Sequence, residues 1–166
     1  MTLRPWRESD VPAIVEACQD PEIPRWTSVP SPYTEQDARD FVAHGVPGRE
    51  YQLQLAIVDA DSDELLGSIG LFTHDEGIGE VGYWMAAAAR GRGAATRAVR
   101  LVVAWGFESY GYERIQLHTL PGNRASERVA EKAGFTREGV LRSYAVMKGR
   151  RTDITMFSLL PGEAQL

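Results

Sequence analysis

The chain has 166 residues, about the size of one domain, of which 43% are hydrophobic and 25% are charged, as in ordinary globular proteins. The net charge of −5 argues against a general nucleic-acid surface and slightly favours a cationic partner. No apolar run approaches the roughly 20 residues that span a bilayer, and the charged start MTLRPWRESD does not have the pattern of a signal peptide. We therefore expect a cytoplasmic protein with a single domain over residues 1–166, without nucleic-acid or membrane partners.

Cysteine and histidine are scarce. The single cysteine, Cys18, cannot form an internal disulfide, and its place on the apolar side of the first helical pattern favours a buried thiol. The three histidines do not have the spacing of a metal site. The sequence thus predicts neither a disulfide nor a metal centre.

The first part of the chain predicts one strand, at residues 3–6, and two helices. In residues 9–18 the apolar positions recur at helical spacing, and Ser9 is expected to cap this helix. The proline-rich segment 20–33 predicts irregular backbone, after which Thr34 caps a second helix that ends near residue 45.

The middle of the chain predicts antiparallel strands. Apolar and polar residues alternate over residues 51–57, which is the period of a half-buried strand. Two more strands are expected at residues 65–72 and 79–85, and the turns at 59–64 and 74–79 join the three into consecutive hairpins.

A long helix is expected over residues 94–111. Its inner face is predicted to carry Ala94, Ala98, Leu101, Val102 and Trp105.

The C-terminal part predicts a strand at residues 115–120, a short helix at 126–134 and two strands at 139–147 and 152–160. The resulting order is β-α-α-β-β-β-α-β-α-β-β. This order predicts an α+β fold, with a mixed, mostly antiparallel sheet and helices on both faces.

The segment RGRGAAT, residues 90–96, lies between a predicted strand and a predicted helix. A helix N-terminus with free N–H groups can bind an anion, and Gly91 and Gly93 let the backbone approach a ligand. Arg90 and Arg92 add positive charge. A Walker loop would need a lysine after Gly93, so ATP fits poorly, and the acidic residue that a dinucleotide site needs after the next strand is missing.

Three segments together resemble the GCN5-related N-acetyltransferase (GNAT) superfamily. R90-G91-R92-G93-A94-A95 is similar to its R/Q-x-x-G-x-G/A signature. E80-V81-G82-Y83-W84-M85 and N123-R124-A125-S126, with the following EKAGF, resemble the RimJ/RimL-type branch. The element order agrees with the fold of this superfamily, and the resemblance covers nearly the whole chain.

The resemblance implies acetyl-CoA as the acyl donor, in addition to the absence of a metal that the histidine and cysteine spacing predicts. Residues Arg90, Gly91, Arg92, Gly93, Ala94 and Ala95 are then expected to bind its pyrophosphate. In this superfamily the sheet opens between the fourth and fifth strands, and the pantetheine arm pairs with the free strand edge. Here that edge corresponds to the backbone of Trp84, Met85 and Ala86, and Asn123 and Ser126 are expected to contact the coenzyme as well.

The catalytic residues implied by the resemblance are Glu80 as the base and Ser126 as the group near the sulfur. An N–H near Met85 is the expected oxyanion donor. His118, beside the expected gap, is a second candidate base. The sequence departs from the wider superfamily at Ala130, where many members have a tyrosine, and at Arg97, where the branch usually has a glutamate.

The acceptor is expected to be a primary amine attacked directly in a ternary complex. Trp26, Tyr33 and Tyr144 are the candidate walls of its site. The resemblance favours a protein N-terminus, and a small amine such as an antibiotic, a polyamine or an amino acid is the alternative. A non-catalytic acyl-CoA-binding module, a donor other than acetyl-CoA and a homodimer are also compatible with the sequence.

Overall fold

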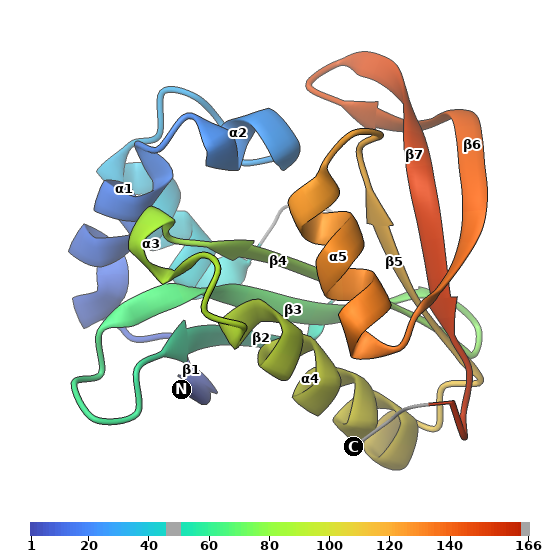
Figure 1. Ribbon diagram of the computed structural model, residues 1–166. Helices are drawn as coiled ribbons and strands as arrows, with labels where there is room; N and C mark the ends of the chain where they lie inside the picture. Colours follow the sequence, from blue (N-terminus) through green and yellow to red (C-terminus); the bar gives the residue numbers. More distant parts are fainter. Residues whose placement is uncertain (46–50, 164–166) are drawn as a thin grey trace.

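The computed structural model describes residues 1–45 and 51–163. Its helices and strands follow in this order: β1 Thr2–Pro5, the 3-10 helix η1 Glu8–Asp10, α1 Val11–Cys18, α2 Glu22–Trp26, α3 Glu35–His44, β2 Tyr51–Val58, β3 Leu65–Asp75, β4 Ile78–Met85, the 3-10 helix η2 Ala87–Ala89, α4 Ala94–Tyr110, β5 Arg114–Thr119, α5 Arg124–Ala133, β6 Thr136–Met147 and β7 Arg150–Leu159 (Figure 1).

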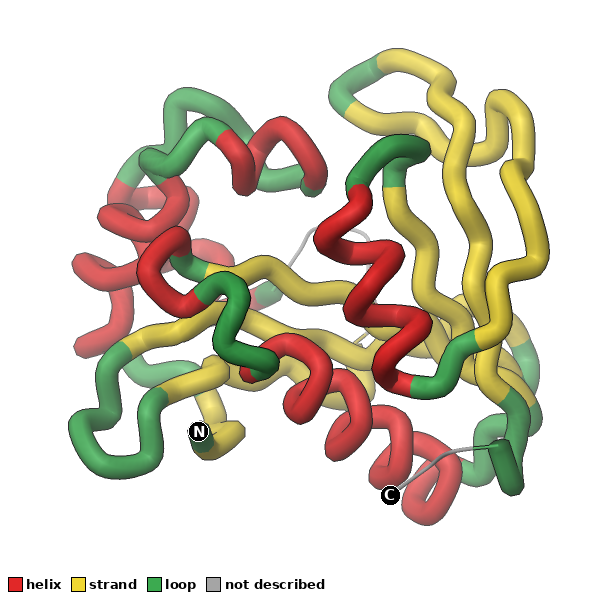
Figure 2. The backbone as a smooth tube through the Cα atoms, viewed as in Figure 1, coloured by secondary structure: helices red, strands yellow, loops and turns green. Residues whose placement is uncertain are grey.

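The strands form one seven-stranded sheet in the order β1-β2-β3-β4-β5-β7-β6. All neighbouring strands are antiparallel except β4 and β5, which are parallel because α4 crosses over between them. This sheet confirms the predicted α+β class, with a mixed and mostly antiparallel arrangement. The half made of β5, β7 and β6 diverges from the half made of β1–β4 (Figures 1 and 2).

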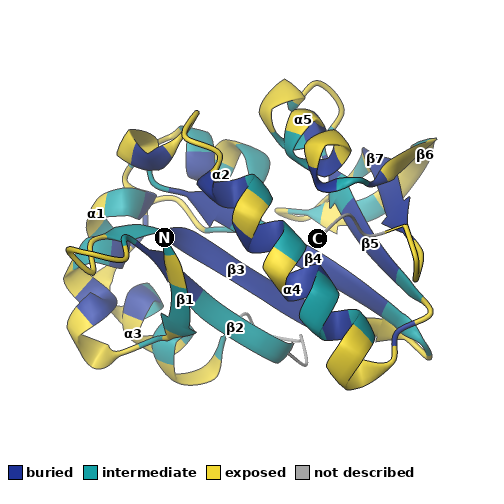
Figure 3. Cartoon of the chain, turned by 60° about the horizontal axis from the view of Figure 1, so that its bottom comes forward, coloured by how far each residue is buried: buried dark blue, intermediate teal, exposed yellow. Residues whose placement is uncertain are grey.

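Each face of the sheet has its own apolar core. Successive side chains of a strand point to opposite faces, so Val81 packs with α4 and α5 while Trp84 packs with α1, α2 and α3. Figure 3 shows the buried faces of the helices turned toward the sheet. The prediction of helices on both faces is therefore confirmed.

The buried stripe of α4 differs from the predicted one at one position. Leu101 is 55% exposed, so its assignment to the inner face was wrong. The stripe instead runs through Ala95, Val99, Val102 and Gly106. A Cβ on Gly106 would lie 2.8 Å from Leu71 Cδ2, which shows how closely the helix approaches β3.

Two local predictions in the N-terminal third also need correction. The segment 20–33 is not wholly irregular, because Glu22–Trp26 forms the short helix α2. Residues Glu8–Asp10 form a 3-10 turn, so Asp10 and not Ser9 occupies the N-cap position of α1, where its side chain makes no capping hydrogen bond to the helix. Thr34 does cap α3 as predicted, and its hydroxyl accepts from the Asp37 N–H in a capping box.

Within residues 1–45 and 51–163, no helix is long and apolar enough to cross a membrane. The same residues contain no cluster of three or more His, Cys, Asp or Glu side chains arranged to hold a metal ion.

Candidate active site

The sheet opens between β4 and β5. The two strands pair only at Ile78 with Arg114, Gly79 with Ile115 and Glu80 with Gln116. Beyond Glu80, β4 continues for five residues along β3 while β5 continues along β7. The predicted opening between the fourth and fifth strands is therefore present.

Backbone groups of β4 line this opening. The Ala86 N–H donates to Leu66 O on β3 at 2.9 Å, and β3 pairs Gly67 with Met85. Because backbone groups of consecutive residues in a strand point to opposite sides, the N–H and C=O of Met85 and Tyr83 face the opening. Of the three residues expected to offer backbone groups, Met85 faces the opening, whereas the backbone groups of Trp84 and Ala86 face β3.

Arg90 crosses from the glycine loop to the end of β4. Its guanidinium donates from Nε and Nη2 to Met85 O at 3.2 and 3.0 Å, and Nη2 lies 2.6 Å from Oδ2 of Asp20. Asp20 in turn accepts from the N–H of Glu22 at the start of α2. The Arg90 side chain thus joins the end of β4 to the segment between α1 and α2, instead of extending from the loop into solvent.

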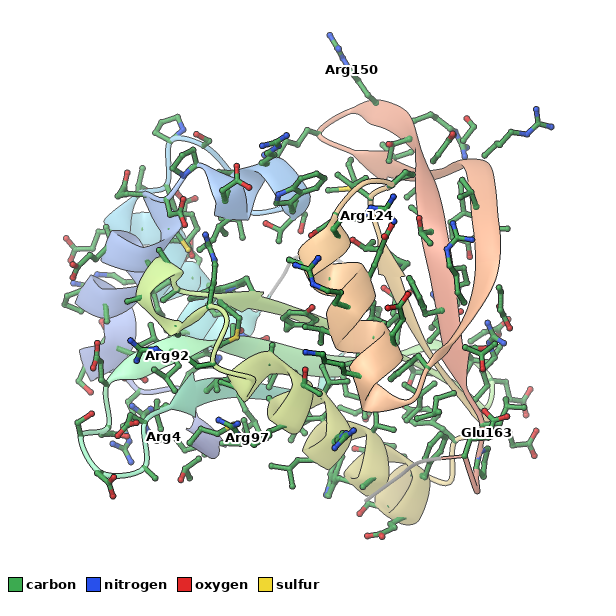
Figure 4. The ribbon with its side chains drawn as sticks, in the orientation of Figure 1. Arg4, Arg92, Arg97, Arg124, Arg150 and Glu163 are labelled. Atoms are coloured by element: carbon green, nitrogen blue, oxygen red, sulfur yellow. The ribbon has the colours of Figure 1, made fainter. Side chains whose placement is uncertain are left out.

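The loop between η2 and α4 has the backbone conformation that its glycines permit. Gly91 and Gly93 have φ of 76° and 75°, in the left-handed region where L side chains are strained. Gly93 is the N-cap of α4 and provides no side-chain cap, so the N–H groups of the first turn depend on other acceptors. Arg92 and Arg97 lie at this end of α4 (Figure 4), and Arg97 donates to Arg92 O.

One cavity of about 1430 Å³ connects this loop with the opening and with α2. That volume exceeds the range of about 300–1,000 Å³ that is usual for a single small-molecule site. Its walls include predicted residues of the donor site and of the acceptor site, namely Trp26, Tyr33, Glu80, Trp84, Met85, Arg90, Gly91, Gly93, Ala94, Ala95, Asn123, Ser126 and Tyr144. The fold therefore brings nearly all of the predicted site residues to one cavity. Arg92 and Ala86 are not among its walls.

Glu80 lies on the floor of this cavity, and its side chain is only 5% exposed. The Gln116 amide donates to its Oε2 at 3.1 Å. The same carboxylate is flanked by two imidazoles: His74 Nδ1 lies 3.3 Å from Oε2 and His118 Nδ1 lies 3.2 Å from Oε1. The sequence had placed His74 in a turn, but β3 extends to Asp75 and carries this histidine to Glu80.

A hydroxyl pair bridges the opening. Tyr83 of β4 and Ser126 of α5 are 3.0 Å apart, and burial raises the pKa of Tyr83 to about 12. Asn123 caps α5, because its side-chain oxygen accepts from the Ser126 N–H at 3.2 Å. Ala130, where many GNAT proteins have a tyrosine, is buried in the core. Tyr83 is thus a phenol at the opening that comes from β4. It was not predicted as a site residue, although it lies in the segment Glu80–Met85 that carries the family resemblance.

The three candidate acceptor walls have different surroundings. Trp26 donates from its indole N–H to Glu22, and Tyr33 is 8% exposed, with burial raising its pKa above the usual range. Tyr144 lies on β6 and is 43% exposed. On the same side, Lys148 in the β6–β7 turn donates to Pro24 O in α2, so the hairpin and α2 meet over the cavity.

Comparisons with known proteins agree with this geometry. The family described as "Acetyltransferase (GNAT) domain" matches residues 1–136. An uncharacterized N-acetyltransferase p20 from Bacillus licheniformis is 30% identical over 168 residues, which cover 98% of this chain and 94% of the relative. A putative ribosomal N-acetyltransferase, YdaF from Bacillus subtilis, is 34% identical over 101 residues, or 60% of this chain and 55% of YdaF.

The fold is shared with solved structures as well. The crystal structure of a putative acetyltransferase from T. thermophilus has a TM-score of 0.82 and 29% identity, and the match covers 97% of this chain and 86% of that one. Fold, open sheet, glycine loop and relatives thus lead to one conclusion: the chain is an N-acetyltransferase that belongs to the GNAT family and is similar to its RimJ/RimL-type members.

Proposed function

We propose that the protein transfers the acetyl group of acetyl-CoA to the α-amine of a protein or peptide N-terminus. The observation that carries this proposal is the buried Glu80 carboxylate on the floor of a cavity that continues to the glycine loop. An α-amine titrates near 8 and a lysine amine near 10.4, so the α-amine loses its proton more readily at neutral pH. The similarity to YdaF, a putative ribosomal N-acetyltransferase, supports a protein as the acceptor.

The donor is held in the opening of the sheet. The N–H groups at the start of α4, with Arg92 and Arg97, bind the pyrophosphate, because a helix N-terminus and positive side chains both favour an anion. The pantetheine arm lies along β4, where the backbone of Met85 faces the opening. Asn123 and Ser126 contact the arm from α5.

The reaction is a direct attack within a ternary complex. Glu80 accepts a proton from the ammonium, and the free amine attacks the thioester carbon to form a C–N bond. The Met85 N–H stabilises the resulting oxyanion. When the C–S bond breaks, the Ser126 hydroxyl protonates the thiolate and takes a proton from Tyr83. The second proton of the attacking nitrogen then passes through water to the Tyr83 oxygen, so the hydroxyl pair is restored and the amide product is neutral. A cavity large enough for both substrates supports this order of events.

A small cationic amine is the second candidate acceptor. Glu22, Asp37 and Asp40 also line the cavity, and carboxylates there would attract a polyamine. A set of three acceptors separates the two candidates: peptides with a free N-terminus, the same peptides with a blocked N-terminus and an internal lysine, and spermidine.

The test measures acetyl-CoA-dependent CoA release and product mass with these acceptors. Glu80→Gln is expected to lower kcat by about 10²–10⁴, the range of a general base. Glu76→Gln, at an exposed turn four residues earlier, is the matched control and is expected to leave kcat unchanged. Intersecting initial-velocity lines support the ternary complex. A free N-terminus that reacts no better than a blocked one would overturn the choice of acceptor, and an active Glu80→Gln would overturn the choice of base.

A further inference from the structure

Three titratable side chains from three adjacent strands meet on the cavity floor. His74 comes from β3, Glu80 from β4 and His118 from β5. Glu80 is 5% exposed, whereas His74 and His118 are 37% and 24% exposed. The carboxylate is thus enclosed, and both imidazoles beside it extend toward solvent.

The strand registers bring these residues to the same face. Across β3 and β4, Phe72 pairs with Glu80, and His74 follows two residues later at a register shift. In the parallel pair of β4 and β5, Glu80 is opposite Gln116, and His118 follows two residues later. The cluster is therefore specified by the sheet and does not depend on a loop.

The two oxygens of the Glu80 carboxylate have different neighbours. Oε2 accepts from the Gln116 amide and also faces His74. Oε1 faces His118, whose Nδ1 is buried and has no hydrogen bond in this arrangement. A buried ring nitrogen without a hydrogen bond is costly and rare, so its position 3.2 Å from Oε1 needs an explanation.

A proton relay explains it. If Glu80 takes a proton from the acceptor amine in every turnover, the buried carboxyl has to lose that proton before the next one. Gln116 cannot accept it, because an amide does not titrate in this range. A neutral imidazole accepts a proton at one ring nitrogen and releases one from the other.

We propose that His118 carries the proton of Glu80 to solvent, with His74 as a second and slower outlet. The step moves the proton from Oε1 of Glu80 to Nδ1 of His118, and the Nε2 proton of His118 then passes to water in the cavity. Before the next turnover the neutral imidazole exchanges protons with water and returns to the tautomer that is protonated on Nε2. The carboxylate is regenerated, and no oxidant or further reactant is needed. This proposal rests on the proposed role of Glu80 as the base. Among the described side chains, the titratable groups placed against Glu80 are His74 from β3 and His118 from β5.

The test compares His118→Asn, His118→Gln and His74→Asn with the natural chain. An asparagine amide can occupy the position of Nδ1 and bond to Glu80, but it cannot relay a proton. At fixed pH and low buffer concentration, His118→Asn is expected to lower kcat on the order of 10-fold, less than loss of the base itself. His74→Asn is expected to lower kcat less, and the KM for acetyl-CoA stays the same in both variants.

Rescue by imidazole separates a relay from a structural role. Added imidazole is expected to restore the kcat of His118→Asn in a saturable manner, because a diffusing base can remove the proton. Glu80→Gln is expected to show no rescue. His44→Asn, at the end of α3, is the histidine control, and its kcat is expected to be independent of imidazole.

The outcomes are distinct. A His118→Asn or His118→Gln chain that folds with an unchanged melting temperature and keeps its kcat in dilute buffer would overturn the relay. So would a lowered kcat that imidazole does not restore. If Glu80→Gln stays active, it is the proposed base that fails, and the relay falls with it.

Discussion

Gly93 provides a direct test of the glycine loop. Its φ of 75° lies in the left-handed region, and a non-glycine residue there costs roughly 1–2 kcal/mol. The Cβ of an alanine would lie 3.2 Å from Arg97 Nη1, the mobile end of a long side chain, so steric overlap adds little. For a domain of this size each kcal/mol changes the melting temperature by about 2–4 °C. Gly93→Ala is therefore expected to melt roughly 2–8 °C lower.

The same substitution is expected to weaken acetyl-CoA binding. If the loop rearranges to relieve the strain, the N–H groups of Ala94 and Ala95 move away from the position where they meet the pyrophosphate. A 10-fold weaker affinity corresponds to about 1.4 kcal/mol. At a hundredfold excess over the dissociation constant, acetyl-CoA stabilises the natural chain by roughly 2.7 kcal/mol, and the variant is expected to gain about half of that.

Thermal unfolding with and without acetyl-CoA measures both effects. Gly91→Ala is the matched control for stability, because Gly91 has a φ of 76° and open space around the position of a Cβ. NAD and ATP, as ligand controls, are expected to leave the melting temperature unchanged. A Gly93→Ala chain that melts at the natural temperature, or that gains the full stabilisation from acetyl-CoA, would refute the reasoning.

Three further predictions concern single side chains. Tyr83→Phe removes the partner of Ser126 and is expected to lower kcat about 10-fold or more, as for loss of a proton-transfer group; an unchanged kcat would remove Tyr83 from the reaction. Burial raises the pKa of the Cys18 thiol to about 12, so the native protein is expected to react with a thiol reagent at pH 8 only after unfolding, and rapid native reaction would contradict this. The Arg114 guanidinium lowers the pKa of Glu138 to about 2 from 4.5, so this carboxylate stabilises the fold above pH 4.5 and the stabilisation is lost as the pH falls toward 2. In melting temperatures measured as a function of pH, Glu138→Gln is expected to reduce the loss of stability between pH 4.5 and 2. An unchanged loss would argue against the Arg114–Glu138 ion pair.

Local sequence patterns were sufficient for most elements. The capping box at Thr34, the glycines at the ends of α4 and α5 and the alternation in the central strands each depend on neighbours within a few residues. The resemblance in three short segments then led to the family, because those segments carry the loop, the fourth strand and the start of α5. Fold class and family could therefore be predicted from the sequence.

Local patterns failed where packing overrides them. The short α2 contains Pro24 yet forms one helical turn, with Ile23 buried in the core against α1 and α3. Leu101 has the spacing of an inner residue, but α4 presents Gly106 to β3 and leaves Leu101 exposed to solvent. Neither outcome depends on sequence neighbours alone.

The sequence by itself determined the elements, the glycine loop and the family, since each of these depends on contacts between residues close in the chain. Only the tertiary structure decided which side chains meet. His74, Glu80 and His118 are brought together by the registers of β3, β4 and β5, and Tyr83 meets Ser126 across the opening of the sheet. The tertiary structure also decides the partners of Arg90, whose side chain donates to Met85 O and pairs with Asp20. Strand register and helix packing are set by the global balance of buried apolar surface and satisfied hydrogen bonds, which no short segment of the sequence contains.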